Sequence, residues 1–189
     1  MTVTPPHIAI ARIVRVNHAG EYGAIRIYGA QILVSRWLWR GIVAPLNTLR
    51  SHEIEHCRLF KAAMPARGSR PCRTMWLWSM GGWLLGFFCA ALGPRAIWVC
   101  TEAVEKNVHR HLADQLSYLR GHDAELHDLI DSIREEEEGH VALALENRGD
   151  ESALTRLLAK SIDIAVNSVI WLSTWGDSAR MRRDLGGLA

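Results

Sequence analysis

The most informative feature of the sequence is a repeated set of carboxylate and imidazole side chains. A glutamate stands 32 positions before a Glu-x-x-His unit, and the same arrangement occurs again with the same offset. Its members are Glu21, Glu53, His56, Glu105, Glu137 and His140. Mixed carboxylate and imidazole ligation suits iron or manganese. The repeat therefore predicts a site for two metal ions, with these six residues as ligands.

The spacing within each unit fits a helical backbone. Residues i and i+3 of an α-helix lie about 60° apart around the axis and about 4.5 Å apart along it, so Glu53 and His56 can reach one site. Single glutamates from two helices and Glu-x-x-His units from two others form the ligand set of ferritin-like di-iron and di-manganese bundles. Two divalent cations neutralise four glutamates, whose charges are otherwise costly to bury. The predicted fold is an all-α, ferritin-like four-helix bundle.

Apolar residues at three- and four-residue spacing predict that the chain is almost wholly helical. A length of 189 residues fits a single domain, with the bundle over about 11–175 and a frayed tail over 176–189. Glycines, prolines and Asp150, an expected cap of the last helix, mark the helix ends. The expected helices cover about 11–39, 46–63, 93–121, 123–147 and 150–175.

A long apolar segment separates the two halves of the repeat. Residues 57–101 contain no Asp or Glu, and 74–94 are uncharged and rich in tryptophan. Their length would suffice for a transmembrane helix, but a single span would put Glu53 and Glu105 on opposite sides of the membrane. We therefore expect a long crossover connection and an extra C-terminal helix in the fold. The crossover is expected on the bundle surface or within one leaflet, with its tryptophans at the lipid interface, although a buried core helix would look similar.

Composition excludes several other classes of protein. The formal net charge of +2 is too small to favour nucleic acid as a partner, and no nucleic-acid-binding motif is present. The four cysteines form no Cys-x-x-Cys pair, which fits reduced thiols in the cytoplasm. Residues 1–10 lack the order of a signal peptide, so the mature chain is expected to start near Met1.

One competing motif overlaps the first unit. His52-Glu53-Ile54-Glu55-His56 matches H-E-x-x-H, the zinc metallopeptidase signature, in which Glu53 would be the general base. A third zinc ligand is missing downstream at the expected spacings, and the second Glu-x-x-His unit would have no role. This peptidase, and a ferritin-like iron oxidase with the same ligand pattern, remain as alternatives.

The ligand segments also carry a resemblance to a known family. Residues 16–24, VNHAGEYGA, resemble the first-ligand segment of the demethoxyubiquinone hydroxylase (Coq7-type) family. The segments around Glu53, Glu105 and Glu137 match its other ligand segments in order, and the resemblance runs from about residue 12 to about residue 175. It implies an O₂-dependent di-iron monooxygenase of ubiquinone biosynthesis, which adds a ring hydroxyl to a polyprenyl methoxy-benzoquinol.

The resemblance further implies particular cofactors, partners and site residues. It assigns two iron ions per chain to the six ligands, with one or two of the catalytic glutamates bridging. His111 falls where the family has a histidine associated with the site, although Leu112 replaces the tyrosine that often follows it. The implied partners are the quinone or quinol substrate, O₂, an external reductant, the membrane lipid surface and accessory ubiquinone-synthesis proteins. The implied location is peripheral, on the cytoplasmic face of the cell membrane.

Overall fold

The computed structural model describes residues 5–174, and this part of the chain is helical almost throughout. No β-strand occurs among the described residues. The elements are α1 (Pro6–Leu38), η1 (Arg40–Ile42), α2 (Val43–Ala63), η2 (Pro65–Arg67), α3 (Met75–Leu92), α4 (Pro94–Leu119), α5 (Ala124–Asn147) and α6 (Ala153–Thr174). The predicted all-α fold is confirmed.

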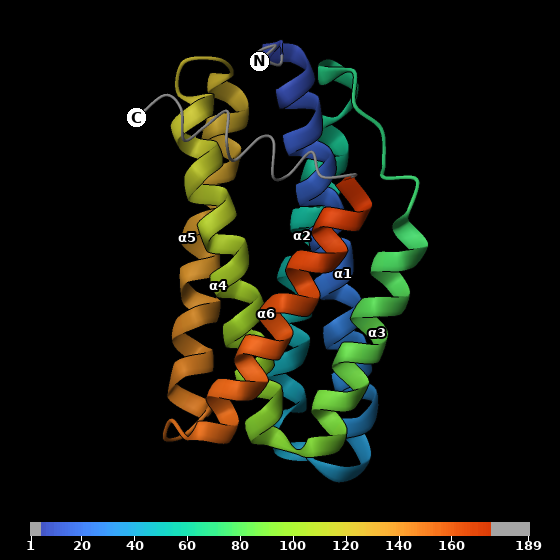
Figure 1. Ribbon diagram of the computed structural model, residues 1–189, viewed down its shortest axis with the longest axis vertical. Coiled ribbons are helices and arrows are strands. Elements are labelled where there is room, and N and C mark those ends of the chain that lie inside the picture. Colours follow the sequence, from blue (N-terminus) through green and yellow to red (C-terminus); the bar gives the residue numbers. More distant parts are fainter. Residues whose placement is uncertain (1–4, 175–189) are drawn as a thin grey trace.

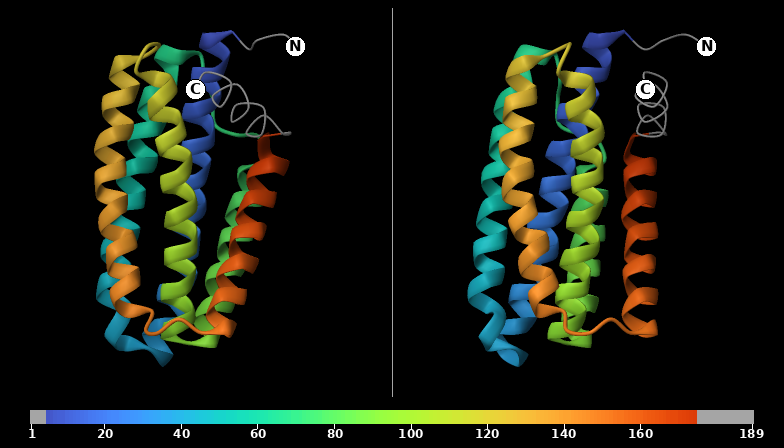
Figure 2. Two further views of the ribbon diagram at one scale, coloured as in Figure 1. Left: turned by 60° about the vertical axis from the view of Figure 1, so that its left-hand side comes forward. Right: turned by 90° about the vertical axis from the view of Figure 1, so that its left-hand side faces the viewer.

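Four of the long helices form the bundle that the ligand pattern requires. Helices α1 and α2 are antiparallel neighbours, as are α4 and α5, and the connection between these two pairs carries α3 (Figure 1). Helix α3 lies along α1, while α6 packs obliquely across α4 and beside α3 (Figures 1 and 2). The long segment between the two halves is therefore a crossover on the outside of the bundle, as predicted.

The helix ends follow local sequence signals. Helix α5 begins after Asp123, whose carboxylate accepts a hydrogen bond from the Leu126 N–H at 3.0 Å and so caps the helix. The expectation that Asp150 caps the last helix is wrong, because the Ser152 hydroxyl accepts the Thr155 N–H at 3.2 Å instead. The predicted frayed tail lies outside the described residues.

Apolar side chains form a layer on each side of the predicted metal ligands. In α1, Glu21 lies between Val14 of one layer and Tyr28 of the other. The ligands of α2 lie between the two layers in the same way. Burial of one large apolar side chain contributes about 1.5–3 kcal/mol, so both layers hold the ligand helices firmly. Fully or almost fully buried members are Ile13, Phe60, Leu119, Leu126 and Ile130 in one layer, and Tyr28, Leu46, Leu49, Ile97 and Trp98 in the other.

A half-buried ion pair joins the end of α2 to the start of α5. Arg67, in the turn after α2, donates to both carboxylate oxygens of Asp123, at 2.7 Å from Nε and 2.9 Å from Nη2. The two side chains are 7% and 17% exposed. The hydrogen bonds from Arg67 hold the pKa of Asp123 below its usual value. The two helices that carry the Glu-x-x-His units are therefore joined at this end.

Helix α3 packs against α1 through glycine. A Cβ at Gly82 or Gly86 would collide with the carbonyl oxygen of Gly23 or Ile27 of α1, so only glycine permits this approach. Among the described residues, α3 is the one helix long and apolar enough to cross a membrane. Its outward side chains are largely exposed, among them Trp76, Met80, Trp83, Leu84, Phe87 and Phe88.

Candidate metal centre

The bundle brings together all six residues that the sequence predicts as metal ligands. Helix α1 supplies one glutamate and α4 another, while α2 and α5 each supply a Glu-x-x-His unit. None of the six is more than 3% exposed. Their role as ligands remains a prediction, but their convergence inside the bundle is what that role requires.

The six side chains form two overlapping groups. One contains Glu21, Glu53, His56 and Glu137, and the other contains Glu53, Glu105, Glu137 and His140. Within each group the nearest ligand atoms all lie within 4.8 Å of one another. Glu53 and Glu137 belong to both groups, so their carboxylates stand where bridges between two ions would stand.

Glu53, a carboxylate of the cluster, has no hydrogen-bond partner for either of its buried oxygens. Buried polar atoms are normally paired, because leaving one unpaired costs about 1–3 kcal/mol. Metal ions would coordinate these atoms, so the donor set fits a pair of iron or manganese ions.

The electrostatics of the cluster also favour cations. Burial, followed by the repulsion of neighbouring glutamates, raises the pKa of Glu21 and Glu53 well above the usual value. Burial would also raise the pKa of Glu137, but hydrogen bonds from His140 and His56 outweigh it and lower that pKa to about 2. Glu137 is therefore readily ionised, whereas Glu21 and Glu53 resist ionisation unless cations balance their charges.

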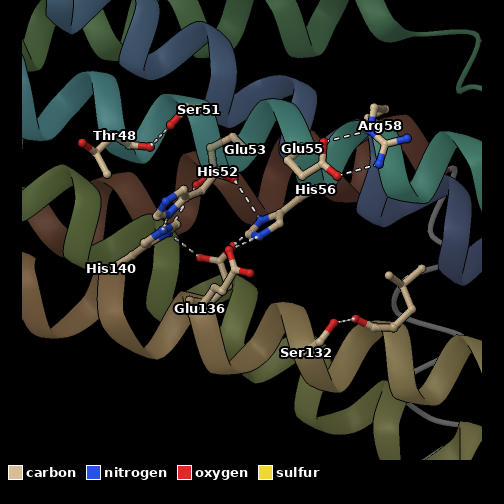
Figure 3. Close-up of polar contacts among 12 residues, drawn as sticks. Thr48, Ser51, His52, Glu53, Glu55, His56, Arg58, Ser132, Glu136 and His140 are labelled. Carbon is tan, nitrogen blue, oxygen red and sulfur yellow. Dashed lines mark hydrogen bonds and ion pairs between the residues drawn. The ribbon is translucent and has the colours of Figure 1, made fainter.

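Two residues contact the outer nitrogens of the cluster histidines. Nε2 of His56 lies 3.1 Å from Oε2 of Glu136, and Nε2 of His140 lies 2.9 Å from Nδ1 of His52 (Figure 3). Neither contact was predicted, since Glu136 had no expected role and His52 belongs to the competing peptidase motif. Both adjoin a predicted ligand glutamate in the sequence, which was the available signal.

The tyrosine of α1 that faces the cluster was also missed. The Tyr28 hydroxyl donates a hydrogen bond to Oε1 of Glu105 inside the bundle. Burial and the nearby Glu105 carboxylate raise the pKa of this phenol well above its usual value, so it remains a donor. Tyr28 thus orients Glu105, a glutamate that belongs to only one of the two groups.

His111 lies in neither metal group. It lines a cavity of about 180 Å³ between α1, α3, α4 and α6, whose wall also includes Glu21 and Asn107. The resemblance placed His111 near the site without making it a ligand, and this role stays a prediction. The cavity therefore adjoins the cluster of predicted ligands through Glu21.

Comparison with known proteins identifies the family. Residues 8–173 match the family described as ubiquinone biosynthesis protein COQ7. The chain belongs to this family. It is 35% identical over 170 residues to the rat mitochondrial NADPH-dependent 3-demethoxyubiquinone 3-hydroxylase, an alignment covering 87% of this chain and 77% of the rat protein.

More distant members agree with this assignment. The 3-demethoxyubiquinol 3-hydroxylase of Rhodospirillum rubrum is 32% identical over 170 residues, covering 89% of this chain and 79% of that protein. The mitochondrial 5-demethoxyubiquinone hydroxylase of Saccharomyces cerevisiae is 27% identical over 175 residues, covering 85% and 75%. Family membership confirms the resemblance found in the sequence and supports neither the peptidase nor the ferritin-like oxidase.

Proposed function

We propose that this protein is a di-iron monooxygenase that hydroxylates a polyprenyl methoxy-benzoquinol, demethoxyubiquinol, with O₂ in ubiquinone biosynthesis. The observation that carries the proposal is the buried pair of ligand groups that share Glu53 and Glu137. Two iron ions held there would supply the activation of O₂, with electrons from an external reductant. The protein's own residues hold the ions, position the ring and exclude water.

The cavity beside Glu21 is suited to the substrate ring. Its wall is mainly apolar and includes Trp78, Gly82, Val104 and Val166. An apolar cavity of about 150 Å³ accommodates a benzene ring, so a volume of about 180 Å³ suits one ring with small substituents. A ring in this cavity would lie next to the metal cluster, because Glu21 belongs to both.

Asn107 supplies a polar contact in the same wall. Its Nδ2 donates to Oδ1 of Asp163 on α6 at 2.9 Å, which fixes the orientation of the amide because a carboxylate only accepts. Its Oδ1 is buried and has no hydrogen-bond partner. A quinol hydroxyl is a donor that would satisfy this oxygen, whereas a quinone has no such donor. This acceptor supports the reduced ring as the substrate.

The proposed location is peripheral, on the cytoplasmic face of the cell membrane. The exposed apolar side chains of α3 would enter one leaflet, and those of α6, such as Leu157, Ile164 and Trp171, would extend the same apolar surface. A polyprenyl tail cannot cross water unassisted, so a protein resting on the lipid surface could receive this substrate directly. Accessory ubiquinone-synthesis proteins are further proposed partners.

The test is complementation of cells that lack their own hydroxylase. The wild-type chain should lower the methoxy-quinone precursor and restore ubiquinone, both measured by chromatography of lipid extracts. Glu53→Ala should fail, whereas Glu55→Ala should succeed because Glu55 is exposed and pairs only with Arg58 at the surface. A wild-type chain that is folded and holds two irons, yet leaves the precursor unchanged, would overturn the proposed substrate.

A further inference from the structure

Both cluster histidines present the same nitrogen to the carboxylates. Nδ1 of His56 lies 3.1 Å from Oε1 of Glu137, and Nδ1 of His140 lies 3.0 Å from Oε2 of the same residue. Their Nε2 atoms point away, toward Glu136 and His52 respectively (Figure 3). Each predicted ligand thus has a separate partner on its outer side.

This arrangement determines the tautomers when metal is bound. An imidazole that gives its Nδ1 lone pair to a metal carries its proton on Nε2 and donates from there. Nδ1 of His52 must then accept this hydrogen bond. The His52 and His140 rings are also stacked, with centroids 5.2 Å apart and an angle of 15° between planes. The contact fixes both the protonated nitrogen and the ring orientation of His140.

The two outer partners are chemically different. Glu136 offers a carboxylate, which accepts a charge-assisted hydrogen bond and makes the donating imidazole a stronger metal ligand. His52 offers a neutral nitrogen, which polarises His140 less. The two outer partners occupy equivalent positions of the sequence repeat, each one residue before the glutamate of the other Glu-x-x-His unit, but they differ in residue type.

We propose that His52 and Glu136 are positioning residues for His140 and His56, and that they make the two metal positions inequivalent. The ion in the group with His56 is held more tightly than the ion in the group with His140. The proposal rests on the proposed function only for the identity of the metal. It also gives His52 a role different from the zinc ligand of the peptidase motif.

A packing role for His52 makes different predictions from a hydrogen-bonding role. Leucine at this position would fill similar space but accept no hydrogen bond, whereas the side-chain oxygen of glutamine could still accept from His140. At Glu136, glutamine keeps an acceptor but removes its charge, which makes this partner resemble His52. Ser51→Ala is the matched control, because the Ser51 hydroxyl bonds the Thr48 carbonyl of its own helix.

The experiment loads the full-length protein with ferrous iron under anaerobic conditions and follows its transfer to a competing chelator at fixed pH. The wild-type protein and Ser51→Ala should each lose two irons in two separate steps. His52→Leu should weaken the more easily lost iron about 10–100-fold and leave the other unchanged, as is typical of lost outer partners. His52→Gln should restore most of this affinity. Glu136→Gln should weaken the tighter iron and bring the two steps together.

Mössbauer spectra of the same samples provide an independent readout. The wild-type protein should show two ferrous signals, of which His52→Leu shifts one and Glu136→Gln shifts the other. Three results would each overturn the proposal. His52→Leu could weaken both irons to the same extent, or it could release iron as the wild-type protein does. In the third, His52→Gln would fail to restore the iron affinity that His52→Leu loses. If His52→Leu does not fold, His52→Gln and Glu136→Gln decide the matter by themselves. A wild-type chain that binds no iron would overturn the proposed function as well.

Discussion

The metal-free protein should respond in opposite ways to the loss of two neighbouring glutamates. Glu137→Gln should destabilise it at neutral pH, whereas Glu21→Gln should stabilise it. The reason is that hydrogen bonds from His140 and His56 lower the pKa of Glu137, while burial and like charges raise that of Glu21. Glutamine has nearly the same size, so neither change leaves a cavity.

The expected size follows from the pKa of Glu137. That pKa falls from 4.5 to about 2, and about 2.5 units at about 1.36 kcal/mol each give about 3 kcal/mol at neutral pH. Breaking a buried ion pair costs about 3–5 kcal/mol, which agrees in order of magnitude. Because the folded-state pKa is lowered, this contribution is present above about pH 4.5 and disappears as the pH falls toward about 2.

Urea denaturation of chelator-treated protein, followed by circular dichroism, measures both variants. At pH 7 the free energy of unfolding should fall by about 3 kcal/mol in Glu137→Gln and rise in Glu21→Gln. The deficit of Glu137→Gln should shrink progressively below pH 4.5. Glu138→Gln is the matched control, because Glu138 is half exposed and pairs with Arg134 at the surface. Equal shifts of the same sign in Glu21→Gln and Glu137→Gln would refute the reasoning.

Three further predictions concern the rest of the molecule. Asp123→Ala should lower the free energy of unfolding by about 2–3 kcal/mol, seen as a Tm lower by about 4–12 °C, because a helix cap and the half-buried partner of Arg67 are lost. Glu125→Ala should change the free energy of unfolding by less than about 0.5 kcal/mol. Replacing Trp76 and Trp83 by Ser should weaken binding to anionic vesicles at least about tenfold in a flotation assay and leave iron content unchanged; equal binding would exclude α3 as the lipid contact. As the pH rises from about 5 to 8, the Tm of the metal-free protein should fall. The pKa values of three cluster glutamates and of both histidines are raised in the folded state, so the folded protein loses stability as these groups give up their protons. Iron loading should remove this fall in Tm, and an identical fall in the iron-loaded protein would contradict the prediction.

Spacing alone predicted much of the candidate site. The equal offsets from Glu21 to Glu53 and from Glu105 to Glu137 require four helices facing one another, and the bundle is the arrangement that satisfies them. The same reasoning placed α3 outside the bundle, since a membrane span would have separated the ligands. The all-α fold is confirmed and the six residues converge, because ligand geometry restricts the relative positions of distant segments, while their role as ligands stays a prediction.

Features that depend on the angle between helices could not be predicted. Whether His52 or another neighbour of Glu53 reaches across to α5 depends on the rotation of α2 about its axis, which periodicity gives only coarsely. The contact of Tyr28 with Glu105 depends in the same way on how α1 and α4 face each other. The cap of α6 was misplaced because Asp150 and Ser152 are both good capping residues, two positions apart.

The glycines that bring α3 against α1 determine more than the distance between the two helices. Helix α3 is apolar on all sides, so it has no polar face that would determine which side packs against the bundle. Gly82 and Gly86 lie one turn apart, and only their side of the helix can approach the α1 backbone so closely. The rotational setting of α3 is therefore encoded by two absent side chains, and this setting directs Trp83 and Phe87 outward. Selection for a particular aromatic face on this protein would act as strongly on the hidden glycines as on the aromatic residues themselves.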